Sequence, residues 1–166
     1  MAAVRELLAE GTFHATTVEE VAARAGVSRA TLYQHFGTRL GLVDAMCDTF
    51  DENPALIALR ETRDLDTWLA RVVDFWSAEE KILVQLYGAA AVDPAARDLV
   101  ERQHRDRHTE LKRLLHALDV DDRTAFAELA VLTSFETYLE LRRHVGLSKR
   151  DVVEAISGAA RHLLQS

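Results

Sequence analysis

The sequence predicts an all-α fold from its periodicity, its composition and its turn signals. Apolar residues recur every three or four positions along almost the whole chain, and no stretch alternates apolar and polar residues as a half-buried strand does. The chain has 48% hydrophobic residues, 28% charged residues and two prolines, which is typical of a globular helical protein. Its 166 residues suffice for a small N-terminal domain at 1–50 and a larger helical domain at 51–166.

The first 25 residues predict two short helices. Apolar residues at helical spacing between 4 and 8 mark the first helix, which we expect to stop at Gly11. Residues 16–17 and 19–20 have the Thr-Thr and Glu-Glu arrangement of a capping box, so a second helix begins there and runs to about Ala25.

A tight turn joins this helix to a third one. Gly26 tolerates the positive φ that ends a helix, and Ser28 caps a helix that extends through His35. Two short helices joined in this way form a helix-turn-helix, whose contacting residues must be small or aliphatic. We expect the inward-facing residues to be Val21, Ala22, Ala25, Val27 and Leu32.

The remaining helices follow from stop and cap signals. Apolar residues between 40 and 50 mark a fourth helix, which ends before Asn53-Pro54. Six more helices are predicted near residues 55–62, 65–76, 79–91, 94–118, 122–145 and 149–164.

The sequence predicts a cytoplasmic protein without membrane contact. No run approaches the roughly 20 apolar residues that span a bilayer, and the chain does not start with a signal-peptide pattern. A single cysteine, Cys47, excludes an internal disulfide and agrees with a reducing compartment. We expect it to be a small buried hydrophobic residue.

The charge is unevenly distributed. The net charge is −7, yet residues 21–43 contain three arginines and no acid. The outward positions of the third helix are polar and acid-free: Arg29, Thr31, Tyr33, Gln34 and His35. An ordinary solvated face is the alternative, but such faces mix both charge signs, and this one is better suited to a polyanion such as double-stranded DNA.

Residues 16–42, TTVEEVAARAGVSRATLYQHFGTRLGL, closely resemble the DNA-binding domain of the TetR family of bacterial transcriptional regulators. The resemblance extends over residues 1–50 with the flanking helices, whereas the rest of the chain is similar only in length and helical character. It implies an N-terminal three-helix helix-turn-helix domain and a C-terminal dimerisation and effector-binding domain. The implied function is a DNA-binding regulator, by default a repressor that a small molecule releases.

The resemblance also implies individual DNA contacts. Thr17 and Tyr33 would hold phosphates, and Arg39 would meet a phosphate at the start of the fourth helix. For Tyr33 the alternative is a ring packed between helices with its hydroxyl in water.

Base-edge contacts are expected from the third helix. Arg29 can bind guanine bidentately, Gln34 can bind adenine, and the Thr31 methyl group can touch thymine. Ser28 and His35 are the remaining candidate DNA-binding residues. His35 either contacts phosphate or closes the helix against Phe36.

The start of the chain departs from the family. Members commonly have a longer first helix and a basic arm before it, whereas Met1-Ala2-Ala3 begins partway along that helix. We expect either a truncated start or the absence of an arm, and correspondingly weaker DNA binding.

The predicted assembly is a homodimer on a palindromic operator, because one recognition helix reads only about four base pairs. The resemblance implies pairing through the last two long helices. The candidate interface residues are Phe126, Leu129, Leu132, Leu139, Val153, Ile156, Ala160 and Leu163. These apolar stripes fit an internal core equally well.

An effector pocket is the second expectation for the C-terminal domain, and an ordinary core is its equal alternative. The candidate lining residues are Trp68, Val72, Trp76, Leu83, Tyr87, Gln103, Arg107 and Glu136. Because a buried charge is costly unless paired, Arg107 either pairs with Glu136 or binds an anionic or polar ligand, and we favour the pair. His104 and His108 have the i,i+4 spacing of metal ligands, but their polar surroundings predict exposed histidines and no metal.

Two other functions are considered. A helical enzyme is not supported, because the sequence has no Gly-rich phosphate loop, metal triad or nucleophile motif, and no cofactor is predicted. The alternative to the regulator is a non-catalytic adaptor with the same fold, which acts through protein partners and binds DNA weakly or not at all. The short N-terminus supports the adaptor, whereas Arg29, Thr31, Tyr33 and Arg39 argue against it.

Overall fold

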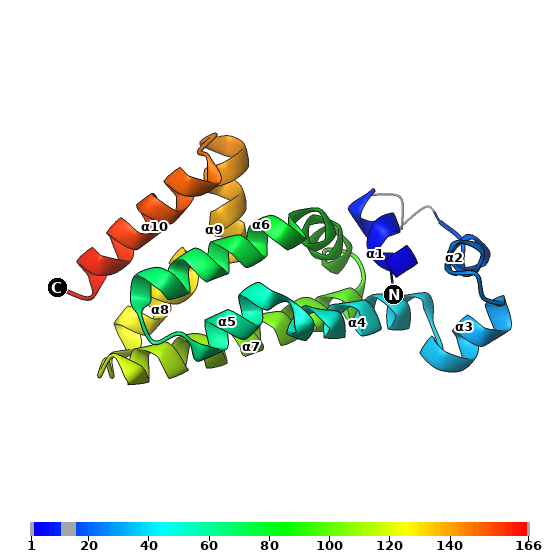
Figure 1. Ribbon diagram of the computed structural model, residues 1–166, viewed down its shortest axis with the longest axis horizontal. Helices are drawn as coiled ribbons and strands as arrows, with labels where there is room; N and C mark the ends of the chain where they lie inside the picture. Colours follow the sequence, from blue (N-terminus) through cyan, green and yellow to red (C-terminus); the bar gives the residue numbers. More distant parts are fainter. Residues whose placement is uncertain (1, 11–15, 166) are drawn as a thin grey trace. The chain divides into compact units, whose positions relative to one another are not determined.

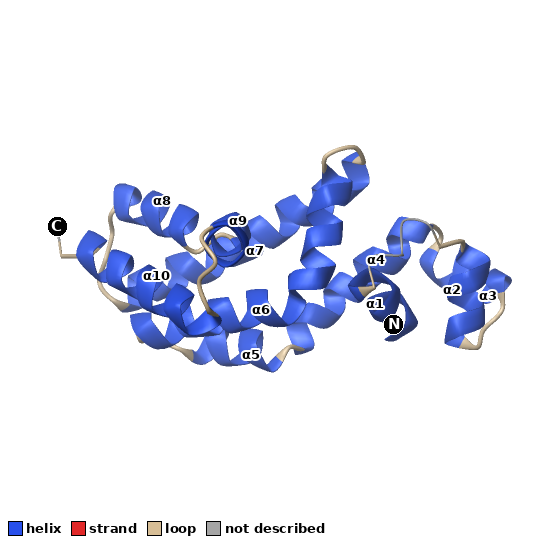
Figure 2. Ribbon diagram, turned by 90° about the horizontal axis from the view of Figure 1, so that it is seen from above, coloured by secondary structure: helices blue, strands red, loops and turns tan. Residues whose placement is uncertain are grey.

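The computed structural model describes residues 2–10 and 16–165, apart from the side chains of Leu8, Arg39, Leu40 and Asp51. In these residues every regular element is helical and none is a strand (Figure 2), which confirms the all-α prediction. The described helices include none that is long and apolar enough to cross a membrane. The chain divides into two compact units, residues 1–52 with 79–103 and residues 53–78 with 104–166.

The first unit contains the N-terminal helices, which we call the head (Figure 1): α1 (Ala2–Ala9), α2 (Val18–Ala25), α3 (Arg29–Phe36) and α4 (Arg39–Asp48). Helices α1 and α3 each contact both α2 and α4. Each helix contributes apolar side chains to the core, among them Val4, Leu7, Val21, Ala22, Leu32, Leu42, Val43 and Met46. The predicted stop of the first helix at Gly11 lies outside the described residues.

Ion pairs attach the head to two long helices within the first unit, α6 (Leu65–Ala90) and α7 (Pro94–Ala117). Arg5 of α1 pairs with Glu79 of α6, whose side chain is 1% exposed. Arg102 of α7 pairs with Asp44 and Asp48 of α4. The charge of Glu79 is tolerated in the interior because a guanidinium compensates it.

The prediction for Cys47 is confirmed, since the thiol is free and buried. Burial raises the pKa of the Cys47 thiol to about 12. At neutral pH the side chain therefore behaves as a small apolar group.

Two helix predictions are wrong. The expected break between 76 and 79 does not occur, and α6 runs through it. The segment has no glycine or proline, and Glu79 pairs with Arg5 instead of capping a new helix. The predicted single helix 122–145 is instead divided into α8 (Arg123–Leu132), α9 (Phe135–Leu139) and a π-helical turn, η2 (Glu140–His144).

The break between α8 and α9 has a local cause. Ser134 has the extended backbone of an N-cap, with ψ 158°, and its side chain accepts a hydrogen bond from the Thr137 amide at 3.1 Å. The buried hydroxyl of Thr133 donates to the carbonyl oxygen of Leu129 at 2.7 Å. Serine and threonine side chains compete in this way with the helical backbone bonds.

The second unit consists of α5 (Pro54–Glu61), the first part of α6, the last part of α7, and the helices α8, α9 and α10 (Lys149–Leu163). Helix α10 begins at a capping box formed by Ser148 and Asp151, and it contacts α8 and η2. Large side chains from these helices are fully buried, namely Trp68, Leu69, Leu111, Leu114, Leu129, Phe135 and Tyr138.

Candidate nucleic-acid interface

The helix-turn-helix begins at the predicted capping box. The Thr17 hydroxyl accepts a hydrogen bond from the Glu20 amide at 3.2 Å, and the Glu20 carboxylate accepts one from the Thr17 amide at 2.6 Å. The hydrogen bond from the Thr17 backbone lowers the pKa of Glu20. Thr17 is exposed, so its side chain remains at the surface where the phosphate contact is predicted.

The turn between α2 and α3 has the predicted geometry. Gly26 lies in the left-handed region with φ 69° and ψ 27°, and Ser28 caps α3 by accepting from the Thr31 amide at 3.1 Å. Two inward assignments are wrong, because Val27 is 40% exposed and Ala25 is also exposed. The turn is at the surface, and the buried contact between α2 and α3 is left to the other predicted residues, Val21, Ala22 and Leu32.

The outer face of α3 is polar and open to solvent. Leu32 is the buried residue of the helix, which turns its other faces outward. Arg29, Gln34 and His35 are exposed, and Tyr33 is 42% exposed. Thr31 is half-buried, and its hydroxyl lies 2.8 Å from that of Ser28. A helix with this exposed polar face can donate hydrogen bonds in a DNA major groove.

Arg29 and Tyr33 form a pair on this face. The guanidinium carbon of Arg29 lies 5.2 Å from the centroid of the Tyr33 ring, at the i,i+4 spacing of helix neighbours. The same guanidinium forms an ion pair with Glu19 of α2. A hydrogen bond with Tyr33 and the charge of Glu19 raise the pKa of Arg29.

The acid-free stretch at 21–43 is therefore less isolated than the sequence indicates. Acids just outside it pair with two of its arginines: Glu19 with Arg29, and Glu10 with Arg24 at 3.1 Å. The sequence signal for the Glu19–Arg29 pair is the position of Glu19 in the first turn of α2, the helix that precedes the one carrying Arg29. The sequence spacing alone, however, does not distinguish Glu19 from the adjacent Glu20 as the partner of Arg29, because the choice depends on how the two helices pack.

The last predicted contacts lie where α3 meets α4. The exposed His35 ring has its centroid 6.1 Å from that of Phe36, which fits the second expectation for this residue. The Thr38 hydroxyl caps α4 by accepting from the Gly41 amide at 2.9 Å. Arg39 occupies the first position of α4, and its side chain lies outside the described part of the chain.

The predicted pocket residues belong to both units. Trp68, Val72, Trp76, Arg107 and Glu136 are in the second unit, while Leu83, Tyr87 and Gln103 are in the first. The apolar members other than the half-buried Tyr87 are buried, as either a pocket wall or a core requires. The pocket thus stays a prediction.

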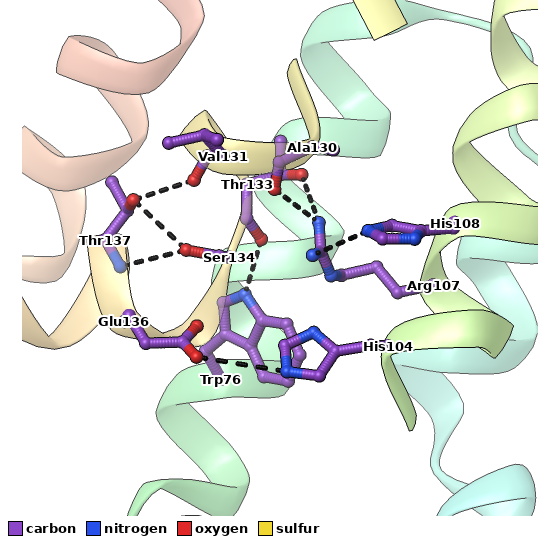
Figure 3. A network of polar contacts seen from close by, with 10 residues as sticks. All are labelled: Trp76, His104, Arg107, His108, Ala130, Val131, Thr133, Ser134, Glu136 and Thr137. Carbon is purple, nitrogen blue, oxygen red and sulfur yellow. Dashed lines mark hydrogen bonds and ion pairs between the residues drawn. The ribbon is translucent and has the colours of Figure 1, made fainter. Parts of the chain in front are cut away.

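Arg107 and Glu136 have different partners from those expected (Figure 3). Arg107 Nη1 donates to the carbonyl oxygen of Ala130 at 2.8 Å and to the Thr133 hydroxyl at 2.9 Å. Glu136 is exposed, and its carboxylate lies 3.9 Å from His104 Nε2. The predicted Arg107–Glu136 pair is therefore wrong: Arg107 bonds the end of α8, whereas Glu136 lies in α9, after a helix break that the sequence did not predict, and each has its own partners.

The helix break is stabilised from neighbouring helices (Figure 3). Trp76 Nε1 of α6 donates to the Thr133 carbonyl oxygen at 3.1 Å, and the Thr137 hydroxyl donates to that of Val131 at 2.7 Å. Together with Arg107, these donors satisfy carbonyl groups at the end of α8. Of the polar residues identified in the sequence, Arg107 therefore has a structural role at this break.

His104 and His108 are half-buried and not fully exposed as expected. Their ring centroids are 6.3 Å apart, and the His108 ring meets Phe126 edge-on at 5.5 Å. Among the described residues, no three His, Cys, Asp or Glu side chains gather as potential metal ligands.

The predicted interface residues divide into two groups. Leu129, Ile156 and Ala160 are buried within the chain itself, where they serve the core of the second unit. The other members are half-buried and keep part of their apolar surface exposed: Phe126, Leu132, Leu139, Val153 and Leu163. The core reading therefore holds for Leu129, Ile156 and Ala160, and the interface stays a prediction.

Comparison with known proteins adds two findings. Residues 1–46 match the family model described as "Bacterial regulatory proteins, tetR family". Over 63 residues, the chain is 35% identical to a Bacillus subtilis (strain 168) protein named "Uncharacterized HTH-type transcriptional regulator YvkB". The matched part covers 38% of this chain and spans only 33% of that relative.

Proposed function

We propose that the protein is a sequence-specific DNA-binding transcriptional regulator, on the premise that its N-terminal part belongs to the tetR family of bacterial regulatory proteins, whose model residues 1–46 match. One observation carries the proposal: α3 buries Leu32 and exposes Arg29, Tyr33 and Gln34. These side chains are of the types that bind phosphates and base edges.

The proposed contacts follow from this exposure. Arg29 and Gln34 read base edges in the major groove, and Thr31 offers its methyl group to a thymine. Thr17, Tyr33 and Arg39 hold phosphates, helped by the positive ends of α2 and α4. Ser28 caps α3 and His35 lies on its exposed side.

We further propose that the protein acts as a homodimer on a palindromic operator in the cytoplasm. Two recognition helices read two half-sites, which supplies the affinity that one helix lacks. The half-buried apolar residues of α8 to α10 support pairing between copies through this part of the chain.

In this proposal residues 1–50 bind DNA, while residues 51–166 dimerise and bind a small-molecule effector. The effector binds more tightly to a dimer conformation in which the two heads are not spaced to fit successive major grooves. It thereby shifts the population toward the conformation that does not bind DNA. The protein is then a repressor that its effector releases. Buried aromatic residues such as Trp68 and Trp76 provide the apolar surroundings that small ligands favour.

The test is binding to fluorescent duplexes from the DNA that flanks the protein's own coding region, across a salt series. We expect one duplex to bind at least about tenfold more tightly than an unrelated duplex, with affinity falling as salt rises. Arg29→Ala/Tyr33→Ala should lower the affinity for the preferred duplex by roughly tenfold or more.

Arg150→Ala is the control, because it removes an exposed arginine of α10 that pairs with Glu154 and lies outside the head. It should keep the wild-type preference. Equal binding of all duplexes by the wild type would contradict the proposal and favour the adaptor. Once a preferred duplex is known, compounds that release it identify the effector.

A further inference from the structure

Glu19 is an acidic residue that touches the proposed DNA-reading face. It lies in the first turn of α2, and its carboxylate pairs with the Arg29 guanidinium of α3. Both side chains are more than half exposed, at 53% for Glu19 and 59% for Arg29. A carboxylate at a surface that approaches phosphates carries an electrostatic cost, so its role there requires an explanation.

The two neighbours of Arg29 define the direction of its side chain. Nη1 is directed to Glu19, and the guanidinium lies over the Tyr33 ring. A guanidinium has five N–H donors in a fixed plane, so a hydrogen bond on one side orients the donors on the other. Bidentate binding of guanine O6 and N7 depends on such orientation.

We propose that Glu19 is a positioning residue that gives Arg29 its selectivity among base pairs. This inference rests on the proposed DNA-binding function. Glu19 keeps the guanidinium directed toward one base edge and competes with phosphate oxygens for its donors. A correctly placed guanine retains its bidentate contact, whereas non-specific contacts to phosphates are disfavoured.

Glu19→Gln removes the charge and retains the length of the side chain. Arg29 then reaches phosphates more freely and is less well oriented toward a base, so selectivity falls even where total affinity rises. Loss of an exposed ion pair is expected to change the ratio of affinities for a preferred and a non-preferred duplex by roughly two- to fivefold.

The experiment first selects preferred duplexes from a random library with the wild-type chain. The base pair read by Arg29 is the position where substitution weakens the wild type but not Arg29→Ala. The measured quantity is the ratio of affinities for the preferred duplex and for the duplex changed at that position. Glu19→Gln should lower this ratio roughly two- to fivefold, and Glu19→Asp, whose shorter side chain holds the guanidinium less well, should lower it in the same direction.

Glu10→Gln is the matched control. Glu10 is an exposed acid of the head that pairs with Arg24, away from α3. Removing its charge should change the affinities for both duplexes by a similar factor and leave their ratio unchanged. Helix content measured by circular dichroism verifies that the variants fold.

The outcomes separate the two proposals. Selection of a preferred duplex by the wild type, with an unchanged ratio in folded Glu19→Gln, would overturn the role of Glu19 alone. An equal fall of the ratio in Glu10→Gln would overturn it as well, since it would indicate a general charge effect. Failure of the wild type to select any duplex would overturn DNA recognition and, with it, this inference.

Discussion

His108 of α7 shows how individual neighbours determine the behaviour of a residue. Its ring is half-buried against Phe126, and Nε2 lies 3.3 Å from Arg107 Nη2. Burial, followed by the positive charge of Arg107 and further charges on α7, lowers the pKa of His108. Because a guanidinium only donates hydrogen bonds, the contact with Arg107 requires a neutral imidazole that accepts through Nε2.

This environment predicts a pH-dependent stability. Since the pKa of His108 is lower in the folded chain than in the unfolded chain, the unfolded chain takes up the proton more readily. The stabilisation is complete above the unfolded pKa of about 6.5 and is lost as the pH falls toward the folded pKa. His108→Gln should reduce the loss of unfolding free energy between pH 7 and pH 5, by less than about 1 kcal/mol for this half-buried group.

Urea unfolding at several pH values measures this effect. Parallel pH profiles for the wild type and His108→Gln would show that His108 does not contribute.

The packing of α3 against α4 determines the geometry of the head at the scale of elements. A Cβ atom on Gly41 would overlap the backbone carbonyl oxygen of Phe36, which ends α3. Only a glycine allows the first turn of α4 to approach α3 so closely. Gly41 also donates its amide to the Thr38 cap, which sets the direction in which α4 begins.

Gly41→Ala should therefore destabilise the head although alanine favours helices. The overlap with backbone is expected to cost up to about 3 kcal/mol of unfolding free energy, against a gain in helix propensity of about 1 kcal/mol. Thermal unfolding followed by circular dichroism tests this. Gly88→Ala is the control, because a Cβ atom there meets nothing within 4 Å, and it should stabilise α6 slightly. A Gly41→Ala variant as stable as Gly88→Ala would show that the close approach is absent.

At the scale of the whole molecule, the proposed dimer requires an apolar surface on which a second copy can pack. Helix α8 carries Val131, which is 69% exposed, next to helices whose apolar residues are partly uncovered. Exposed apolar surface of this kind is typical of interaction sites when it is contiguous. Val92, in the turn after α6, is 86% exposed but belongs to the other unit.

The proposed dimer predicts different effects for these two valines. If the exposed Val131 of α8 lies in the proposed interface, Val131→Glu should shift the protein from dimer to monomer and raise the dimer dissociation constant roughly tenfold or more, because a charge within an interface must be desolvated. Val92→Glu should not change the dissociation constant. Sedimentation equilibrium over a concentration series distinguishes these outcomes. A monomeric wild type, or a Val131→Glu variant that still dimerises normally, would contradict the α8 interface.

Local chemistry allowed the sequence by itself to determine the helices of the head. The capping box at Thr17, the left-handed Gly26 and the Ser28 cap each depend on residues within a few positions of one another. The same local pattern underlies the similarity to tetR-family proteins. The burial of Leu32 and the exposure of Arg29 also follow from helical spacing and were predicted.

Tertiary structure decided the features that depend on distant residues. The Arg5–Glu79 pair accompanies an uninterrupted α6, and contacts from Trp76 and Arg107 stabilise the break after α8. The Glu19–Arg29 pair likewise joins side chains on two helices, and the local caps do not specify which side chains meet. Hydrogen bonds and ion pairs between helices depend on how the helices pack, and that is why the caps could be predicted while these partners could not.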